Sequence, residues 1–141
     1  MTAGMTAGMT AGMTAGMVLA IALLAGIGAP ARYVVDRWVT DRAARLPWAP
    51  FPWGLLVVNA SGSLIAGLVL ALASGTAQTV LLVGLCGAFT TFSGFGWDLT
   101  RLWGQARAIF WATLGAMPAA CLAAFLIGWG SGHMLAGECL R

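Results

Sequence analysis

Neutral polar and aromatic side chains are the residues of this chain whose types and spacing could do chemistry. The segment GLCGAFTTFSGFGWD (residues 84–98) combines glycines, two adjacent threonines, a serine and two phenylalanines three residues apart, Phe92 and Phe95. An earlier pair, Asn59 and Ser63, lies one helical turn apart. Amides and hydroxyls donate hydrogen bonds, and the edge of an aromatic ring carries weak positive potential. This combination suits a small anion that is bound without a full countercharge.

The backbone of the same segment could also bind a cation. Glycine, serine and threonine are poor helix formers, and their concentration in residues 87–96 predicts a break in a helix. A break frees carbonyl oxygens, which neighbouring helices or a cation must then satisfy in apolar surroundings. A simpler interpretation of Asn59 and Ser63 stays open. The small residues beside them suit close helix packing, so the two polar side chains could serve only to hold helices together.

The sequence does not predict an enzyme. A nucleophile elbow around Ser93 would require glycine two residues earlier, where Thr91 stands, and the only histidine, His133, lies beyond the apolar segments. A proton-coupled exporter would need a carboxylate near the centre of the bilayer. The four acidic residues all lie at the ends of the apolar segments or beyond them: Asp36, Asp41, Asp98 and Glu138.

Composition places the chain in a membrane. Sixty per cent of its 141 residues are hydrophobic and 8% are charged, whereas about a quarter of a soluble domain is charged. A spanning helix needs about 20 apolar residues. Residues 46–97 carry no charge and divide at the polar cluster 74–78, so the sequence predicts an all-α integral membrane protein with four spans. These spans lie near residues 17–37, 53–73, 79–97 and 108–130.

The distribution of arginine predicts the orientation. The arginines gather in the first and third connections between spans, so the positive-inside rule places these connections in the cytoplasm and both termini outside. The net charge of +3 follows from this topology and does not indicate nucleic acid as a partner. Residues 17–132 form the expected membrane domain and 133–141 a short tail. The MTAG repeat of residues 1–16 is expected to be disordered or untranslated.

Three sequence blocks resemble the Fluc (CrcB) family of bacterial fluoride channels. They are GAPARY at residues 28–33, FPWG with the following VN and GS at residues 51–63, and GLCGAFTTFSGF at residues 84–95. The third block is the most specific. The resemblance covers residues 17–130, and the blocks occur in the family's order on four spans.

The resemblance implies an antiparallel dimer in the bacterial plasma (inner) membrane, with passive fluoride pores and a broken third helix. It also implies a structural sodium ion that is not transported and is held at the dimer centre by backbone carbonyls, here those of Gly87 and Thr90. Carried over to this chain, the fluoride pore involves Asn59, Phe92 and Phe95, with hydroxyls of Thr91 and Ser93. Structural roles are implied for Arg32 and Asp98.

Several positions depart from the family pattern. Leu55 stands where a threonine is usual, Asp98 replaces a glutamate, and Thr113 is the only polar candidate in a fourth helix that Pro118 is expected to interrupt. These departures and the arginine bias keep alternatives open. The chain could be a self-sufficient homodimer, half of a heterodimer with a related subunit of opposite topology, or a non-conducting assembly subunit.

Overall fold

The computed structural model describes residues 13–139, and within this range the chain is entirely helical apart from its connections. The predicted all-α fold is therefore confirmed. The expectation for the MTAG repeat falls mostly on residues 1–12, which lie outside the described part. The elements are α2 (Ala15–Ala43), α3 (Trp53–Leu72), α4 (Gly75–Thr79), the π-helix η1 (Val80–Cys86), α5 (Gly87–Phe89), α6 (Phe92–Gln105) and α7 (Arg107–Cys139).

Four segments of the described chain are long and apolar enough to cross a membrane, as predicted. Their bounds are Ala15–Ala43, Trp53–Leu72, Gly75–Gln105 and Arg107–Gly137. Three of them are longer than the sequence pattern indicated, because the helices continue past the apolar stretches into polar or charged residues. The segment expected to be a short tail begins within α7, which runs to Cys139.

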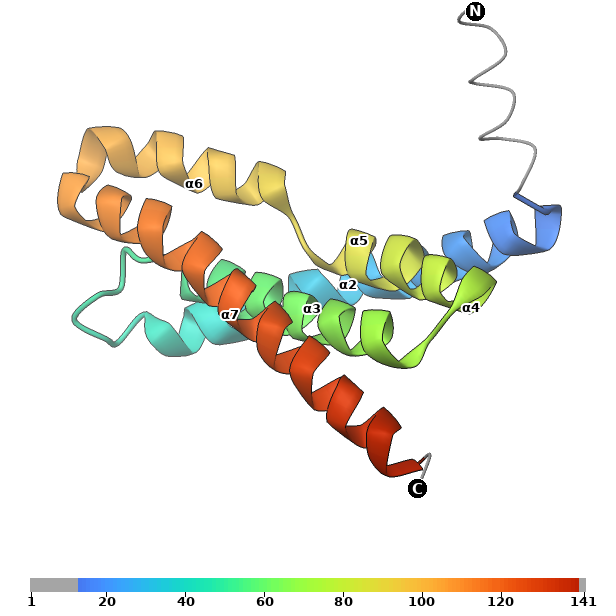
Figure 1. Cartoon of the computed structure of the whole chain (residues 1–141). Coiled ribbons are helices and arrows are strands. Elements are labelled where there is room, and N and C mark those ends of the chain that lie inside the picture. Colours follow the sequence, from blue (N-terminus) through green and yellow to red (C-terminus); the bar gives the residue numbers. More distant parts are fainter. Residues whose placement is uncertain (1–12, 140–141) are drawn as a thin grey trace, which may run out of the picture.

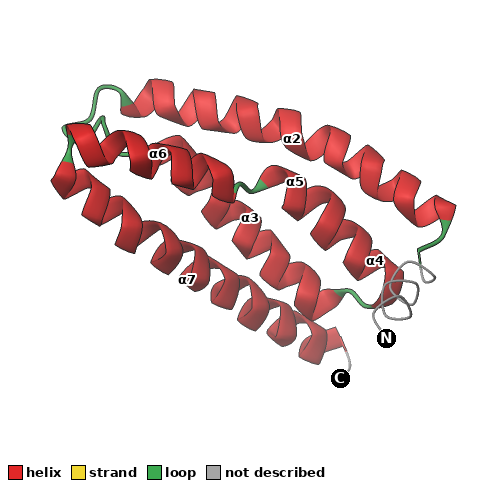
Figure 2. Ribbon diagram, turned by 90° about the horizontal axis from the view of Figure 1, so that it is seen from above, coloured by secondary structure: helices red, strands yellow, loops and turns green. Residues whose placement is uncertain are grey.

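The connections gather at two opposite ends of the bundle (Figure 2). The loop between α2 and α3 and the junction of α6 with α7 lie at one end, and the α3–α4 connection lies at the other. The start of α2 and the end of α7 share the second end. Arg42 and Arg45 belong to the first end and Arg107 begins α7 there, so we call it the arginine-rich end.

The third span is broken, as predicted, and its two parts pack against different helices (Figure 1). Helices η1 and α5 pack against α2, whereas α6 packs against α7. The break itself is short: Thr90 and Thr91 are extended, with φ/ψ of −81°/162° and −150°/125°. Gly94 and Gly96, expected among the helix-breaking residues, lie inside α6. The π-helix just before the break was not predicted.

Glycines bring α3 and α7 together along much of their length. A Cβ atom added to Gly67 would collide with the Phe125 carbonyl oxygen, and one added to Gly128 would collide with the Leu64 carbonyl oxygen. The two helices run parallel, because Gly128 lies against Leu64 and Leu68, and Gly132, one turn later on α7, lies against Ala71 and Leu72. This close approach places residues 117–121 of α7 level with residues 55–59 of α3.

Pro118 does not interrupt the fourth helix, so that expectation was wrong. Helix α7 continues from Arg107 to Cys139 with Pro118 inside it. A proline removes one backbone hydrogen bond, but in a membrane the remaining bonds favour continuation, because hydrocarbon offers no other partner for the backbone. Pro118 instead contributes to the wall of a cavity described below.

Candidate functional site

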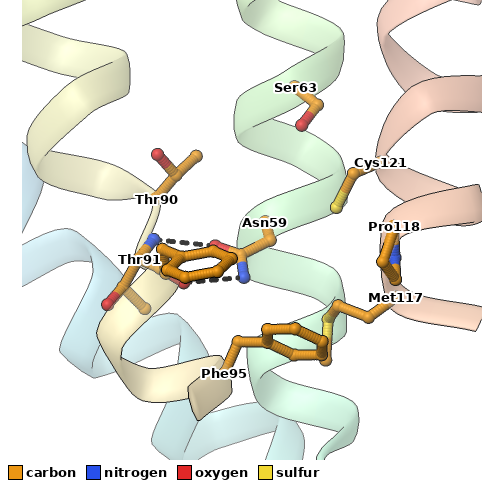
Figure 3. Close-up of a pocket in the computed structure, with 9 residues that line it drawn as sticks. Asn59, Ser63, Thr90, Thr91, Phe95, Met117, Pro118 and Cys121 are labelled. Carbon is orange, nitrogen blue, oxygen red and sulfur yellow. Dashed lines mark hydrogen bonds between the residues drawn. The ribbon is translucent and has the colours of Figure 1, made fainter. Parts of the chain in front are cut away.

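The side chain of Asn59 holds the break in the third span. Its Nδ2 donates to the Thr91 carbonyl oxygen at 3.1 Å, and its Oδ1 accepts from the Thr91 N–H at 2.8 Å (Figure 3). Asn59 is 8% exposed. A carboxamide can pair with both polar groups of a backbone residue in this way because it carries a donor and an acceptor. One N–H of its NH₂ group is not used in this pairing.

The first turn of α6 presents further donors beside the break. Thr91 caps the helix, since its Oγ1 accepts from the Gly94 N–H at 3.2 Å and lies 3.1 Å from Ser93 Oγ. The first N–H groups of a helix have no partner within that helix, and the helix dipole places partial positive charge there. Amide, hydroxyl and backbone donors thus meet at the point where the third span resumes.

Two carbonyl oxygens at the break have no backbone partner among the described residues. The N–H and Oγ1 of Thr90 both donate to the Cys86 carbonyl oxygen at 2.9 Å. The N–H of Thr91, which would continue the helix by donating to Gly87, is taken by Asn59. Within residues 13–139, no backbone hydrogen bond between elements reaches the carbonyl of Gly87 or of Thr90. These free oxygens have the chemistry that a hard cation prefers.

The two phenylalanines have different surroundings. Their ring centroids are 5.8 Å apart, at an interplanar angle of 51°. Phe95 is 8% exposed and packs in an apolar cluster with Leu55 and Met117. Phe92 is 84% exposed. The chain therefore fixes one ring and leaves the other on its surface.

A cavity of about 270 Å³ brings most of the predicted pore residues together. Helix α3, the break and the start of α6 contribute Asn59, Ser63, Thr90, Thr91, Phe92 and Phe95. Helix α7 supplies the facing wall, which sequence reasoning did not identify: Met117, Pro118 and Cys121. A methionine, a proline and a cysteine on an apolar helix have no pattern of their own that would indicate a site.

Ser93, Arg32 and Asp98 line a second cavity, of about 370 Å³. Thr91 lines both cavities. A third cavity of about 500 Å³ shares Asp36 and Asp98 with the second, and it reaches Pro50 in the connection at the arginine-rich end. The three cavities therefore form a series from that end of the bundle to the break. Gly87 lines none of them.

Charges of both signs lie along the outer part of this series. Asp98 Oδ1 is 3.1 Å from Arg101 Nη2, and Asp36 Oδ1 accepts from Thr40 Oγ1 at 3.5 Å. Arg32 lines the second cavity together with these carboxylates. In contrast, the described residues that line the cavity at the break include no charged side chain. The charged groups thus lie near the mouth of the series, and neutral donors lie in its interior.

Two of the departures from the family pattern have clear positions. Leu55 is buried and lines the second cavity. This wall is therefore apolar at the position where the family pattern has the hydroxyl of a threonine. Thr113 is fully buried, its hydroxyl has no hydrogen-bond partner in the described structure, and it lines none of the three cavities. Thr113 thus does not replace a polar residue of the path.

The fold and the site together define a small multi-pass membrane protein with four spans, a broken third span and a neutral polar cavity at the break. Residues 19–130 match the family model described as CrcB-like protein, Camphor Resistance (CrcB). The chain belongs to the CrcB family. The resemblance found in the sequence blocks is thereby confirmed.

Relatives of the chain carry the name of an ion channel. A Corynebacterium jeikeium protein named Fluoride-specific ion channel FluC 1 is 38% identical over 84% of this chain and 92% of its own length. A Thermus thermophilus protein named Fluoride-specific ion channel FluC is 36% identical over 84% of this chain and 95% of its own length. A Nocardia farcinica relative is 46% identical over 60% of this chain, and the match spans 58% of that relative. These relatives confirm that the family is one of channels rather than enzymes.

Proposed function

We propose that the chain is a subunit of a fluoride-selective passive ion channel in the bacterial plasma membrane. The observation that carries this proposal is the series of cavities that leads from the arginine-rich end to Asn59 and the Phe92–Phe95 pair. Membership of the CrcB family and the names of its relatives support the choice of ion.

The site offers donors to replace the hydration shell of a small anion. The free N–H of Asn59, the hydroxyls of Thr91 and Ser93 and the edges of the two phenylalanine rings supply hydrogen bonds and weak positive potential. None of these groups carries a full charge, so the anion is not held too tightly to leave. Fluoride that has entered as neutral HF and dissociated would leave outward, driven by the inside-negative membrane potential.

A structural sodium ion is the second part of the proposal. The free carbonyls of Gly87 and Thr90 fit an alkali cation, because hard cations prefer oxygen ligands and these oxygens lack backbone partners. When bound, the ion supplies fixed positive charge near the anion path. The Thr91–Asn59 pairing keeps the Gly87 carbonyl out of the helical hydrogen-bond ladder. Replacing sodium by a large organic cation is expected to reduce fluoride flux.

A second subunit is the third part of the proposal. The cavity at the break opens on the surface of the chain, and the 84% exposure of Phe92 marks this opening. A related or identical subunit in the opposite orientation would complete the wall. The buried apolar cluster of Leu55, Phe95 and Met117 favours a second candidate function, in which this chain conducts only with a heterologous partner or supports its assembly.

Fluoride efflux from liposomes tests the proposal. The purified full chain is reconstituted alone, and efflux is followed with a fluoride electrode, with chloride as the control anion. We expect efflux of fluoride but not of chloride. If the folded chain alone is silent but becomes active with a related subunit of opposite charge bias, it is half of a heterodimer. Silence in both cases contradicts the channel proposal.

A pair of phenylalanine variants separates a channel from an assembly protein. Phe92→Ile removes an aromatic edge from the cavity, and Phe110→Ile makes the same change in α7, outside all three cavities. In a channel, Phe92→Ile is expected to abolish efflux while both variants keep the oligomeric state of the parent. Equal effects of the two substitutions would contradict a pore role for Phe92.

A further inference from the structure

A separate groove lies at the arginine-rich end, outside the cavities of the proposed ion path. It measures about 240 Å³ and is lined by residues of α2, of the following loop and of the start of α3: Trp38, Val39, Arg42, Ala43, Leu46 and Trp53. None of these residues lines the three cavities described above. The lining is apolar except for one guanidinium group and the indole N–H groups.

The cationic side of the groove is arranged for an acidic ligand. The Arg42 guanidinium lies over the ring of Trp38, with its carbon 4.0 Å from the ring centroid. Stacking occupies a face of the guanidinium and leaves its in-plane N–H donors available, the geometry in which arginine binds phosphate. The only ion pair among the described residues joins Asp98 to Arg101, so Arg42 has no acidic partner there.

Trp53, in the opposite wall, makes two contacts with the preceding loop. Trp53 Nε1 donates to the Trp48 carbonyl oxygen at 3.2 Å, and the Trp53 ring lies 4.8 Å from the ring of Phe51. These contacts orient Trp53 at the start of α3, and the floor of the groove, Val39 and Leu46, is aliphatic. A flexible hydrocarbon chain can lie between two such walls without displacing either of them.

The groove lies at the depth of lipid headgroups. Met17 begins the apolar part of α2, and Trp38 follows it by a helical rise of about 30 Å, the thickness of the hydrocarbon core. Tryptophan favours this boundary. Arg42 lies one further turn along α2 and thus at the level of the phosphates. Two more arginines of the same end, Arg37 and Arg45, lie outside the groove.

We propose that this groove binds an anionic phospholipid, with its phosphate on Arg42 and an acyl chain along Val39 and Leu46, between Trp38 and Trp53. Charge complementarity selects an anionic headgroup, and the apolar floor selects an amphiphile over free phosphate. Bound lipid would fix the α2–α3 loop relative to the membrane. The proposal rests on the groove alone and does not depend on which ion the protein conducts.

Native mass spectrometry of the detergent-purified full chain tests this site. Dioleoyl phosphatidylglycerol and dioleoyl phosphatidylcholine are titrated separately, and the first lipid adduct is quantified. Arg42→Gln removes the phosphate ligand, and Arg45→Gln is a matched control that removes one charge from the same end outside the groove. We expect the parent chain to prefer phosphatidylglycerol, and Arg42→Gln to weaken its first binding step about tenfold. Arg45→Gln should leave that step unchanged.

Trp38→Leu is a second, independent variant. It keeps the charge of Arg42 but removes the ring on which the guanidinium lies, and we expect it to weaken phosphatidylglycerol binding as well. Unchanged circular dichroism and gel-filtration profiles verify folding of each variant. Equal losses in Arg42→Gln and Arg45→Gln would indicate diffuse surface charge and overturn the proposal. Equal binding of the two lipids by the parent chain would also overturn the proposal. So would a dimer in which a second copy of the chain closes the groove and no lipid is retained.

Discussion

Replacing Asn59 with alanine is expected to destabilise the whole bundle, although the residue lies at the proposed pore. Its carboxamide makes the two hydrogen bonds, of 2.8 and 3.1 Å, that pair with the N–H and C=O of Thr91. These bonds join α3 to the break in the third span. Alanine would leave both of these partly buried backbone groups without a partner in the protein.

The structure sets the size of the effect. A buried polar group that loses its only partner costs about 1–3 kcal/mol, so Asn59→Ala should lower the free energy of unfolding by about 2–6 kcal/mol. Asn59→Asp still accepts from the Thr91 N–H but places an oxygen against the Thr91 carbonyl oxygen. It loses one bond and gains a repulsion, so its cost should be at least about 1–3 kcal/mol.

Unfolding in mixed micelles with increasing dodecyl sulfate measures this free energy, with tryptophan fluorescence as the probe. Ser63→Ala is the matched control, because Ser63 lines the same cavity one turn along α3 and has no hydrogen bond among the described residues. Fluoride efflux is measured on the same preparations. Asn59→Ala should reduce stability and flux, whereas Ser63→Ala should leave stability within about 0.5 kcal/mol of the parent.

Equal stability of the Asn59→Ala and Ser63→Ala variants would refute this reasoning. The break would then not depend on the Asn59–Thr91 pairing, and Asn59 could act only as a pore donor. Loss of flux in a fully stable Asn59→Ala variant would point to the same conclusion. Loss of stability in Asn59→Ala also explains why Phe92, and not Asn59, is the better residue for separating conduction from assembly.

Three further substitutions test other parts of the structure. Gly128→Ala should lower the free energy of unfolding by about 1–3 kcal/mol, because its Cβ would meet a backbone carbonyl of α3. Gly130→Ala, two residues later, has open space around its Cβ and should be nearly neutral. Equal effects of the two substitutions would refute the close packing of α3 and α7. Asp98→Asn should cost under about 0.5 kcal/mol, since its ion pair with Arg101 is partly exposed, and a larger loss would indicate a further partner. Leu55→Thr should lower the same free energy by about 2–3 kcal/mol yet raise fluoride flux; unchanged flux would exclude this wall from the path.

The spans could be predicted from the sequence because a membrane imposes a simple condition on composition. Every backbone polar group must be satisfied within the span, so long uncharged segments become helices whatever their detailed order. The charged residues that follow each segment mark the ends only approximately. Helix α2 continues to Ala43 and α7 to Cys139, because helical hydrogen bonds persist where the side chains are already polar.

The exact place of the break could not be predicted from local propensity. Glycines occur between residues 84 and 96, yet within this stretch only Thr90 and Thr91 leave the helical conformation and adopt extended backbone angles. Asn59, on α3 and 32 residues earlier in the sequence, determines where the break lies, because its carboxamide pairs with the backbone of Thr91. The π-helix Val80–Cys86 has ordinary apolar residues and no local pattern that would indicate it. The cavity wall from α7 likewise depends on how α3 and α7 pack.

The cavity at the break constrains what lies beside the chain in the membrane. The exposure of Phe92 alone decides nothing, because an aromatic ring can face lipid without cost. The polar groups next to it decide the question: Asn59, Thr90 and Thr91 line an opening on the surface of the chain. Hydrocarbon cannot satisfy the N–H of Asn59 that the Thr91 pairing leaves unused. That opening must therefore face water or a second protein surface, and the two-subunit channel proposed above would supply both.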